Sequence, residues 1–235
     1  MEVDLELDTT WLEHDWNRRQ LERPVSAVDF RVWHHRRPAI VLGCSQRALH
    51  TGCSSRLPAG VALLERSTGG GAVLSGPWMV SVSVVLPPDH DGVTGSWLSA
   101  YRWLGRLHAE ALAGLGIPTW AVPPEAVTRA NQGWGDGVPW ACFGRLAPWE
   151  LTDLAGRKLV GLAQRRQSNG VLLVAGTLCQ QPDWSLLCEA MGCPGTASRL
   201  QEITSSCDRV SKEPLDPGTL TLRLTRVLSA GLLAG

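Results

Sequence analysis

Lys158 stands out among the ionisable residues because this chain otherwise uses arginine for its positive charges. All but Lys158 and Lys212 of the 22 basic side chains are arginine. Lys158 lies in Gly-Arg-Lys-Leu-Val-Gly-Leu-Ala-Gln-Arg, a glycine-flanked apolar segment at residues 156–165. A compact, titratable ammonium kept in such a segment indicates chemistry that arginine cannot perform. The alternative is an ordinary solvated lysine.

A run of three glycines is the second feature whose residue types could do chemistry. Gly69, Gly70 and Gly71 precede Ala72, and Arg66 stands three residues before them. Glycines let backbone N–H groups approach an anionic or carbonyl-bearing ligand without interference from a Cβ, and an arginine can bind such an anion with two hydrogen bonds. The segment matches neither the P-loop nor the dinucleotide-binding Gly-x-Gly-x-x-Gly pattern. A simple tight turn is the alternative.

Length and composition predict a single domain over residues 1–235. The chain is 44% apolar, which is ample for a core, and its formal net charge is zero. Nucleic-acid binding normally needs a basic face, so we expect no nucleic-acid partner. The acidic N-terminal segment has no basic region, and no stretch reaches the ~20 apolar residues of a membrane span. We therefore expect a cytoplasmic protein without a membrane partner.

The cysteines predict free thiols and no metal site. There are seven, an odd number, with no Cys-x-x-Cys pair. The spacing of Cys188 and Cys193 could contribute to a zinc site, but no second close pair or His-x-x-x-His accompanies it. His34 and His35 lie beside two arginines, which is typical of a polar turn.

Periodicity predicts a mixture of helices and strands. Predicted strands position both the run of three glycines and the segment around Lys158. His108 falls on the apolar stripe of one predicted helix and is interpreted as a core histidine. Residues 123–139 are glycine-rich at their end and predict a loop. Ser168-Asn169-Gly170 predicts a hairpin turn that places Lys158 near the start of a central strand. Helices are expected at about residues 10–23, 97–115, 184–191 and 220–228, and strands at 30–33, 39–42, 61–65, 80–86 (half-buried), 149–154, 157–165 and 171–178.

Three segments together resemble the lipoate–protein ligase and octanoyltransferase family, which shares its catalytic fold with biotin–protein ligases. Residues 32–46 look like the family's early strand pair that ends in a Gly-x-x-Gln turn, and residues 65–73 look like its Ser/Thr-Gly-Gly-Gly-Ala-Val loop. Residues 156–165 look like its Gly-Arg-Lys strand. The resemblance covers residues 10–178. It implies an α+β fold of the α/β sandwich type, with a mixed, mainly antiparallel sheet and helices packed on one face.

The resemblance also implies an enzyme that attaches a lipoyl or octanoyl group to a lysine of a lipoyl carrier domain, either of an E2 subunit or of the glycine cleavage H-protein type. Lys158 would contact the acyl carbonyl or an adenylate phosphate. The arginine and loop named above, Arg66 and Gly69 to Ala72, would line the acyl and adenylate site, and Gln164 would help to shape it. An apolar tunnel would hold the acyl tail.

Members of the family activate the acyl group by one of two mechanisms, and this chain has residues typical of each. Ligases form an acyl-adenylate from ATP with Mg²⁺, whereas one class of octanoyltransferases uses a cysteine and needs no such cofactor. Ala-Cys-Phe at residues 141–143 resembles the segment that supplies this cysteine, so Cys142 is a candidate nucleophile whose thiolate Lys158 could stabilise. A buried structural cysteine is the alternative. The triple glycine slightly favours the ligase mechanism over the cysteine mechanism. We also expect an acyl carrier protein or a separate accessory subunit as a partner.

The sequence departs from the family in two places. The His-Asp that usually follows the glycine loop is replaced by Leu-Ser-Gly-Pro-Trp at residues 74–78, and the His-Gly-Ser after the hairpin reads Val-Ala-Gly-Thr at residues 174–177. We expect no C-terminal accessory domain. A non-catalytic binding protein that keeps the fold is therefore a further alternative, while the adenylate-loop signature of biotin ligases is absent from the sequence.

Overall fold

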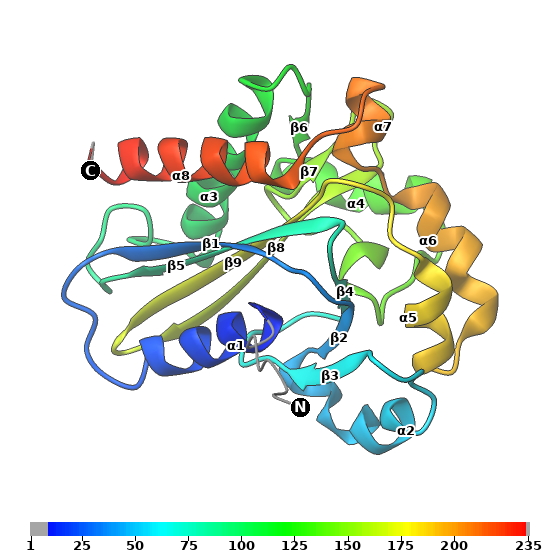
Figure 1. Cartoon of the computed structure of the whole chain (residues 1–235). Coiled ribbons are helices and arrows are strands. Elements are labelled where there is room, and N and C mark those ends of the chain that lie inside the picture. The colour runs from blue at the N-terminus through cyan, green and yellow to red at the C-terminus, as the bar shows by residue number, and fades with distance from the viewer. Residues whose placement is uncertain (1–8, 234–235) are drawn as a thin grey trace, which may run out of the picture.

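Two β-sheets form the scaffold of the computed structural model, which describes residues 9–233 (Figure 1). The larger sheet has six strands in the order β1-β5-β9-β8-β7-β6, and every neighbouring pair is antiparallel. Its strands are β1 (Asp29–His34), β5 (Met79–Leu86), β6 (Trp120–Ala121), β7 (Leu151–Thr152), β8 (Lys158–Gln167) and β9 (Gly170–Leu178).

The smaller sheet has three strands in the order β3-β2-β4 and mixed directions. Strand β2 (Ala39–Leu42) is parallel to β3 (Ala62–Glu65) and antiparallel to β4 (Val73–Ser75). The expected mixed, mainly antiparallel α+β architecture is therefore confirmed. Because β3 and β4 flank the triple glycine, this sheet fixes both ends of the glycine loop.

Helices surround the sheets, and the two longest, α3 and α8, cover one face of the larger sheet (Figure 1). Helix α1 packs on the opposite face, where its Trp16 and the following Leu21 pack with Val85 and Leu172. The helices are α1 (Thr9–Gln20), α2 (His50–Ser54), α3 (Trp97–Ala113), α4 (Pro124–Gly133), α5 (Trp184–Ala190), α6 (Ala197–Ile203), α7 (Cys207–Ser211) and α8 (Pro217–Leu233), with short 3-10 turns at Cys44–Leu49, Cys142–Gly144 and Pro194–Thr196.

Local signals in the sequence account for several element boundaries. The Ser96 hydroxyl accepts a hydrogen bond from the Leu98 N–H and caps α3, and the Asp183 carboxylate caps α5 in the same way. The predicted hairpin is present: Gln167 pairs with Gly170, so Ser168 and Asn169 form a two-residue turn between β8 and β9. Lys158 is accordingly the first residue of a central strand.

Two expectations about local structure were wrong. Strand β5 is buried on both faces, because its serines lie on the face that α1 covers and have partners from β1 and the residue after it. Ser83 accepts from the Trp33 indole, and Ser81 hydrogen-bonds His35. The predicted loop at residues 123–139 contains helix α4, which begins with Pro124 at a position where its missing N–H costs nothing.

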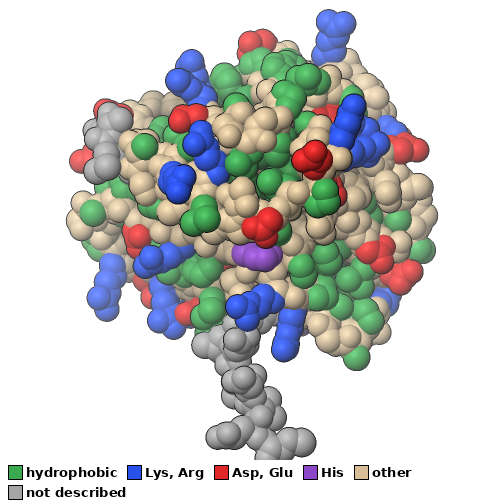
Figure 2. Space-filling model, turned by 45° about the horizontal axis from the view of Figure 1, so that its top comes forward, with side chains coloured by type: hydrophobic (Ala, Val, Ile, Leu, Met, Phe, Trp, Pro, Cys, Tyr) green, Lys and Arg blue, Asp and Glu red, His purple; other side chains and the backbone are tan. Residues whose placement is uncertain are grey.

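Basic and acidic side chains are interspersed on the surface in Figure 2, as the zero net charge suggests. Among residues 9–233, no helix combines the length and apolar character required to cross a bilayer. All seven cysteines are free thiols.

Candidate active site

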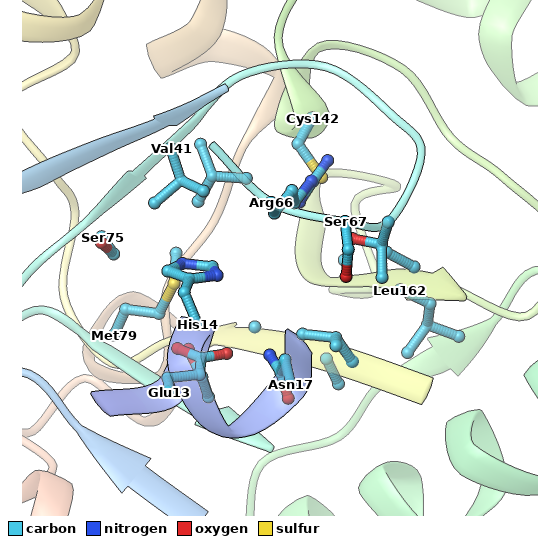
Figure 3. Close-up of a pocket in the computed structure, with 18 of the residues that line it drawn as sticks. Glu13, His14, Asn17, Val41, Arg66, Ser67, Ser75, Met79, Cys142 and Leu162 are labelled. Atoms are coloured by element: carbon cyan, nitrogen blue, oxygen red, sulfur yellow. The ribbon is translucent and has the colours of Figure 1, made fainter. Parts of the chain in front are cut away.

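A pocket opens between α1, the glycine loop and the central strands of the larger sheet, with a cavity volume of about 50 Å³ (Figure 3). Apolar side chains from five strands, β2, β4, β5, β8 and β9, form much of its wall. Polar side chains come from α1, from the segment after β3, and from β4 and β5. Its lining consists of Glu13, His14, Asn17, Val41, Arg66, Ser67, Thr68, Val73, Ser75, Met79, Ser81, Cys142, Phe143, Gly161, Leu162, Ala163, Val174, Ala175 and Gly176.

Cys142 is held at this pocket by the glycine loop, although the two segments lie far apart in the sequence. Ala72 and Ala141 form an isolated parallel bridge, in which the Cys142 N–H donates to the Ala72 carbonyl at 2.9 Å and the Ala72 N–H donates to the Trp140 carbonyl at 2.8 Å. A Cβ on Gly71 would overlap the Trp140 carbonyl oxygen. Glycine at this position therefore permits the close approach of the two backbones.

The Gly-x-x-Gln turn joins the same assembly. The Gln46 side chain donates to the Trp140 carbonyl at 2.9 Å, and its own carbonyl oxygen accepts from the Gly43 N–H. A Cβ on Gly43 would overlap the carbonyl oxygen of Gly70. The structure thus brings the turn, the glycine loop and the Cys142 segment into direct contact.

The Lys158 ammonium is buried directly behind Cys142, with 1% of the residue exposed. It donates to the Cys142 carbonyl at 2.7 Å and to the Arg145 carbonyl at 2.9 Å, and it forms an ion pair with Glu150 at 2.6 Å. These three acceptors match the three N–H groups of an ammonium. Lys158 is therefore not a solvated lysine, and its partners fix the backbone that carries the Cys142 thiol.

Glu150 is the buried counterion that the sequence analysis missed. Its second oxygen accepts from the Leu162 N–H at 2.9 Å, and the oxygen that meets Lys158 also accepts from the Ala147 N–H at 2.7 Å. Burial raises the pKa of this carboxyl, while Lys158 and these backbone donors oppose the shift. A buried lysine needs a carboxylate within reach, which is the signal that could have found Glu150.

Of the other predicted site residues, one lines the pocket and the others lie in the surrounding structure. Arg66 lines the pocket, and its guanidinium donates to the Gly71 carbonyl at 2.8 Å while its Nε has no hydrogen-bond partner. Gly69, Gly70 and Ala72 shape the loop behind this arginine and do not line the pocket themselves. Gln164 lies farther along β8, where its amide donates to the Trp97 carbonyl.

Helix α1 supplies a polar side to the pocket that the sequence analysis did not anticipate. Glu13 is 3% exposed, and its carboxyl lies 3.3 Å from the His35 Nε2; Asn17 and Ser81 also hydrogen-bond this carboxyl. Burial raises the pKa of Glu13 to about 8 against the opposing charge of Arg66. His35 is thus buried rather than placed in a polar turn, and only the folded chain brings it to α1.

Within residues 9–233, no group of three or more His, Cys, Asp or Glu side chains is arranged to hold a metal ion. The site itself contains the Cys142 thiol, the Lys158 and Glu150 ion pair, and Arg66.

Comparison with known proteins shows which family the sequence matches. The model of the lipoyl protein ligase A/B catalytic domain matches residues 4–212. Octanoyltransferase LipM of Staphylococcus aureus is 34% identical over 127 residues, which cover 53% of this chain and 44% of that protein. The LipM of Moorella thermoacetica is 36% identical over 119 residues, covering 51% and 41%. The matches thus span less than half the length of these relatives.

Solved structures with the same fold come from lipoate ligases. A bipartite lipoate protein ligase from Thermoplasma acidophilum, studied with its E2 lipoyl domain, has a TM-score of 0.66 at 18% identity and covers 96% of this chain and 79% of that one. A lipoate-protein ligase A bound with ATP gives 0.66 at 20% identity, covering 94% and 79%. At these identities the likeness describes the fold.

Proposed function

Since the chain belongs to the lipoyl protein ligase A/B catalytic domain family, we propose that it transfers an octanoyl-type acyl group through Cys142 to a lysine of a lipoyl carrier domain. The observation that carries this proposal is the thiol of Cys142 in the lining of a pocket with an apolar wall. The LipM relatives, which are octanoyltransferases, favour this route over the adenylate route that the triple glycine suggested.

In the first step, the Cys142 thiolate attacks the carbonyl carbon of an acyl thioester. A bond forms between Sγ and that carbon, the original carbon–sulfur bond breaks, and the leaving thiolate takes up the proton that Cys142 has lost. Negative charge develops on the carbonyl oxygen during the attack. Arg66 lines the same pocket, so its guanidinium supplies a positive charge there that would stabilise this oxygen.

In the second step, the amine of a carrier-domain lysine attacks the Cys142 thioester, forms an amide and releases the thiol. Lys158 has a positioning role in both steps, because its contacts fix the Cys142 carbonyl and hence the direction of the side chain. The family's other route, in which ATP with Mg²⁺ forms an acyl-adenylate, would use the same pocket without the thiol.

Acylation of Cys142 is the first test. Incubation with an octanoyl thioester should give an octanoyl adduct on Cys142 in mass spectrometry, and Cys142→Ala should lose the adduct and the transfer to a carrier domain. Cys44→Ala is the matched control, because Cys44 is exposed and lies outside the pocket lining. Modification of the carrier with lipoate and ATP by Cys142→Ala would instead support the ligase route, and no modification by either route would support a non-catalytic binding protein.

A further inference from the structure

A second cavity adjoins the pocket that Cys142 lines. This outer cavity has a volume of about 360 Å³ and lies between α1, the end of β3 and the second half of β8. His14, Arg66 and Ser67 line both the inner pocket and the outer cavity. The two spaces are therefore separated by a single layer of residues.

The inner pocket is too small to hold a whole octanoyl chain. Its volume is about 50 Å³, whereas a protein cavity of about 150 Å³ holds one benzene molecule. An octanoyl group has more carbon atoms than benzene. Only the first carbons of a chain bound to Cys142 therefore fit in the inner pocket, and the remaining carbons have room in the outer cavity.

Of the three residues that separate the cavities, His14 has the bulky side chain that no hydrogen bond fixes. The Arg66 guanidinium is held by the Gly71 carbonyl at 2.8 Å, and Ser67 has only a small side chain. The His14 imidazole makes no hydrogen bond or ion pair with any of residues 9–233, and in Figure 3 it points from α1 into the pocket. Turning or removing this ring would join the two cavities.

The outer cavity can accommodate the end of an alkyl chain. Trp11 and Leu64 give it an apolar surface, and Trp11 is 45% exposed without a ligand. The Arg18 and Arg47 side chains at the same cavity are 62% and 65% exposed, so their charged ends remain in water. A chain that reaches this cavity would bury apolar surface against Trp11, which favours binding.

We infer that His14 determines the length of the acyl chain that Cys142 accepts. Short chains fit in the inner pocket without moving the imidazole, whereas an octanoyl chain binds when the imidazole turns aside and opens the outer cavity. This inference rests on the proposed acyl transfer through Cys142. Within that function, it names His14 as the residue that sets chain-length specificity.

A competition experiment tests the inference on the intact chain. Butanoyl and octanoyl thioesters of N-acetylcysteamine are offered together at equal concentration, and mass spectrometry measures the ratio of octanoyl to butanoyl adduct on Cys142. His14→Ala should raise this ratio by about tenfold, because the joined cavities let the longer chain bury its end without displacing a side chain.

Two further variants show whether the volume of the side chain is responsible. His14→Phe places a larger ring between the cavities and also lacks the imidazole, so the ratio should fall by about tenfold. Gln20→Ala is the matched control, because Gln20 is also on α1 but lines neither cavity. Its ratio should equal that of the unmodified chain.

The outcomes distinguish this inference from the proposed function. Equal ratios in the unmodified chain, His14→Ala and His14→Phe would overturn the role of His14 and leave acyl transfer standing. A shift in the same direction in both His14 variants would also overturn it, since the effect would then not follow side-chain volume. Absence of both adducts from the unmodified chain would overturn the function itself.

Discussion

The ammonium of Lys158 is fully occupied by the Cys142 carbonyl, the Arg145 carbonyl and the Glu150 carboxylate. At the scale of single residues, this arrangement makes the lysine a support for the thiol. Its charge is balanced within the protein, so it stabilises the local structure only as long as Glu150 remains opposite it.

Removing one member of the pair should cost far more stability than removing both. Lys158→Met leaves Glu150 buried and unpaired, which should lower the free energy of unfolding by about 3 to 5 kcal/mol. Adding Glu150→Gln should recover much of this loss, as measured by urea denaturation.

The double variant also distinguishes a role of Lys158 in positioning the thiol from a role in stability alone. If Lys158 positions the thiol, the refolded double variant should still acylate Cys142 at least about tenfold more slowly than the unmodified chain. A double variant with a normal acylation rate would show that the pair matters for folding alone.

At the scale of elements, two loops meet where the Ala72 and Ala141 backbones pair. The glycines do not contribute equally to this contact. Gly71 faces the Trp140 carbonyl at a distance that excludes a side chain, whereas a Cβ on Gly69 would meet no atom within 4 Å. The loop therefore offers a sensitive and an insensitive position two residues apart.

Gly71→Ala should displace the Cys142 segment and reduce acylation at least about tenfold, because small misplacements of a reacting group have large effects on rate. Gly69→Ala should leave the rate within about twofold, since its surroundings are open. Mass spectrometry of adduct formation over time measures both. Equal rates for the two variants would mean that the bridge does not position the thiol.

At the scale of the whole molecule, the core contains a histidine whose titration is linked to unfolding. His108 is 1% exposed in α3 and donates from Nδ1 to the Leu104 carbonyl, while Nε2 has no partner. Burial lowers the pKa of His108 from 6.5 to about 4. The unfolded chain therefore takes up a proton at higher pH than the folded chain does.

Stability should accordingly fall as the pH drops from about 6.5 towards 4, and His108 should account for about 3 kcal/mol of that fall. His108→Leu should weaken the pH dependence by this amount, whereas above pH 7 the contribution of His108 does not change with pH. Urea denaturation of both proteins between pH 4 and pH 8 provides the comparison. Parallel profiles would exclude His108 as the titrating group.

Sequence patterns predicted the hairpin, the long helices and the segments that meet at the site, because capping residues, turn residues and periodicity act locally. They did not reveal Glu150 or the Glu13 and His35 contact, since these pairs form only when distant segments fold together. The prediction of a half-buried strand β5 was wrong for the same reason. Alternation of valine and serine indicates one solvent-exposed face, but α1 covers the serines.

The bridge between Ala72 and Ala141 also affects how the site responds to heat. It is isolated, with a single backbone hydrogen bond in each direction, and it lies outside the regular ladders of both sheets. Short pairings of this kind open at lower free energy than a central ladder does. Warming should therefore open this contact before either sheet melts, so inactivation should precede melting.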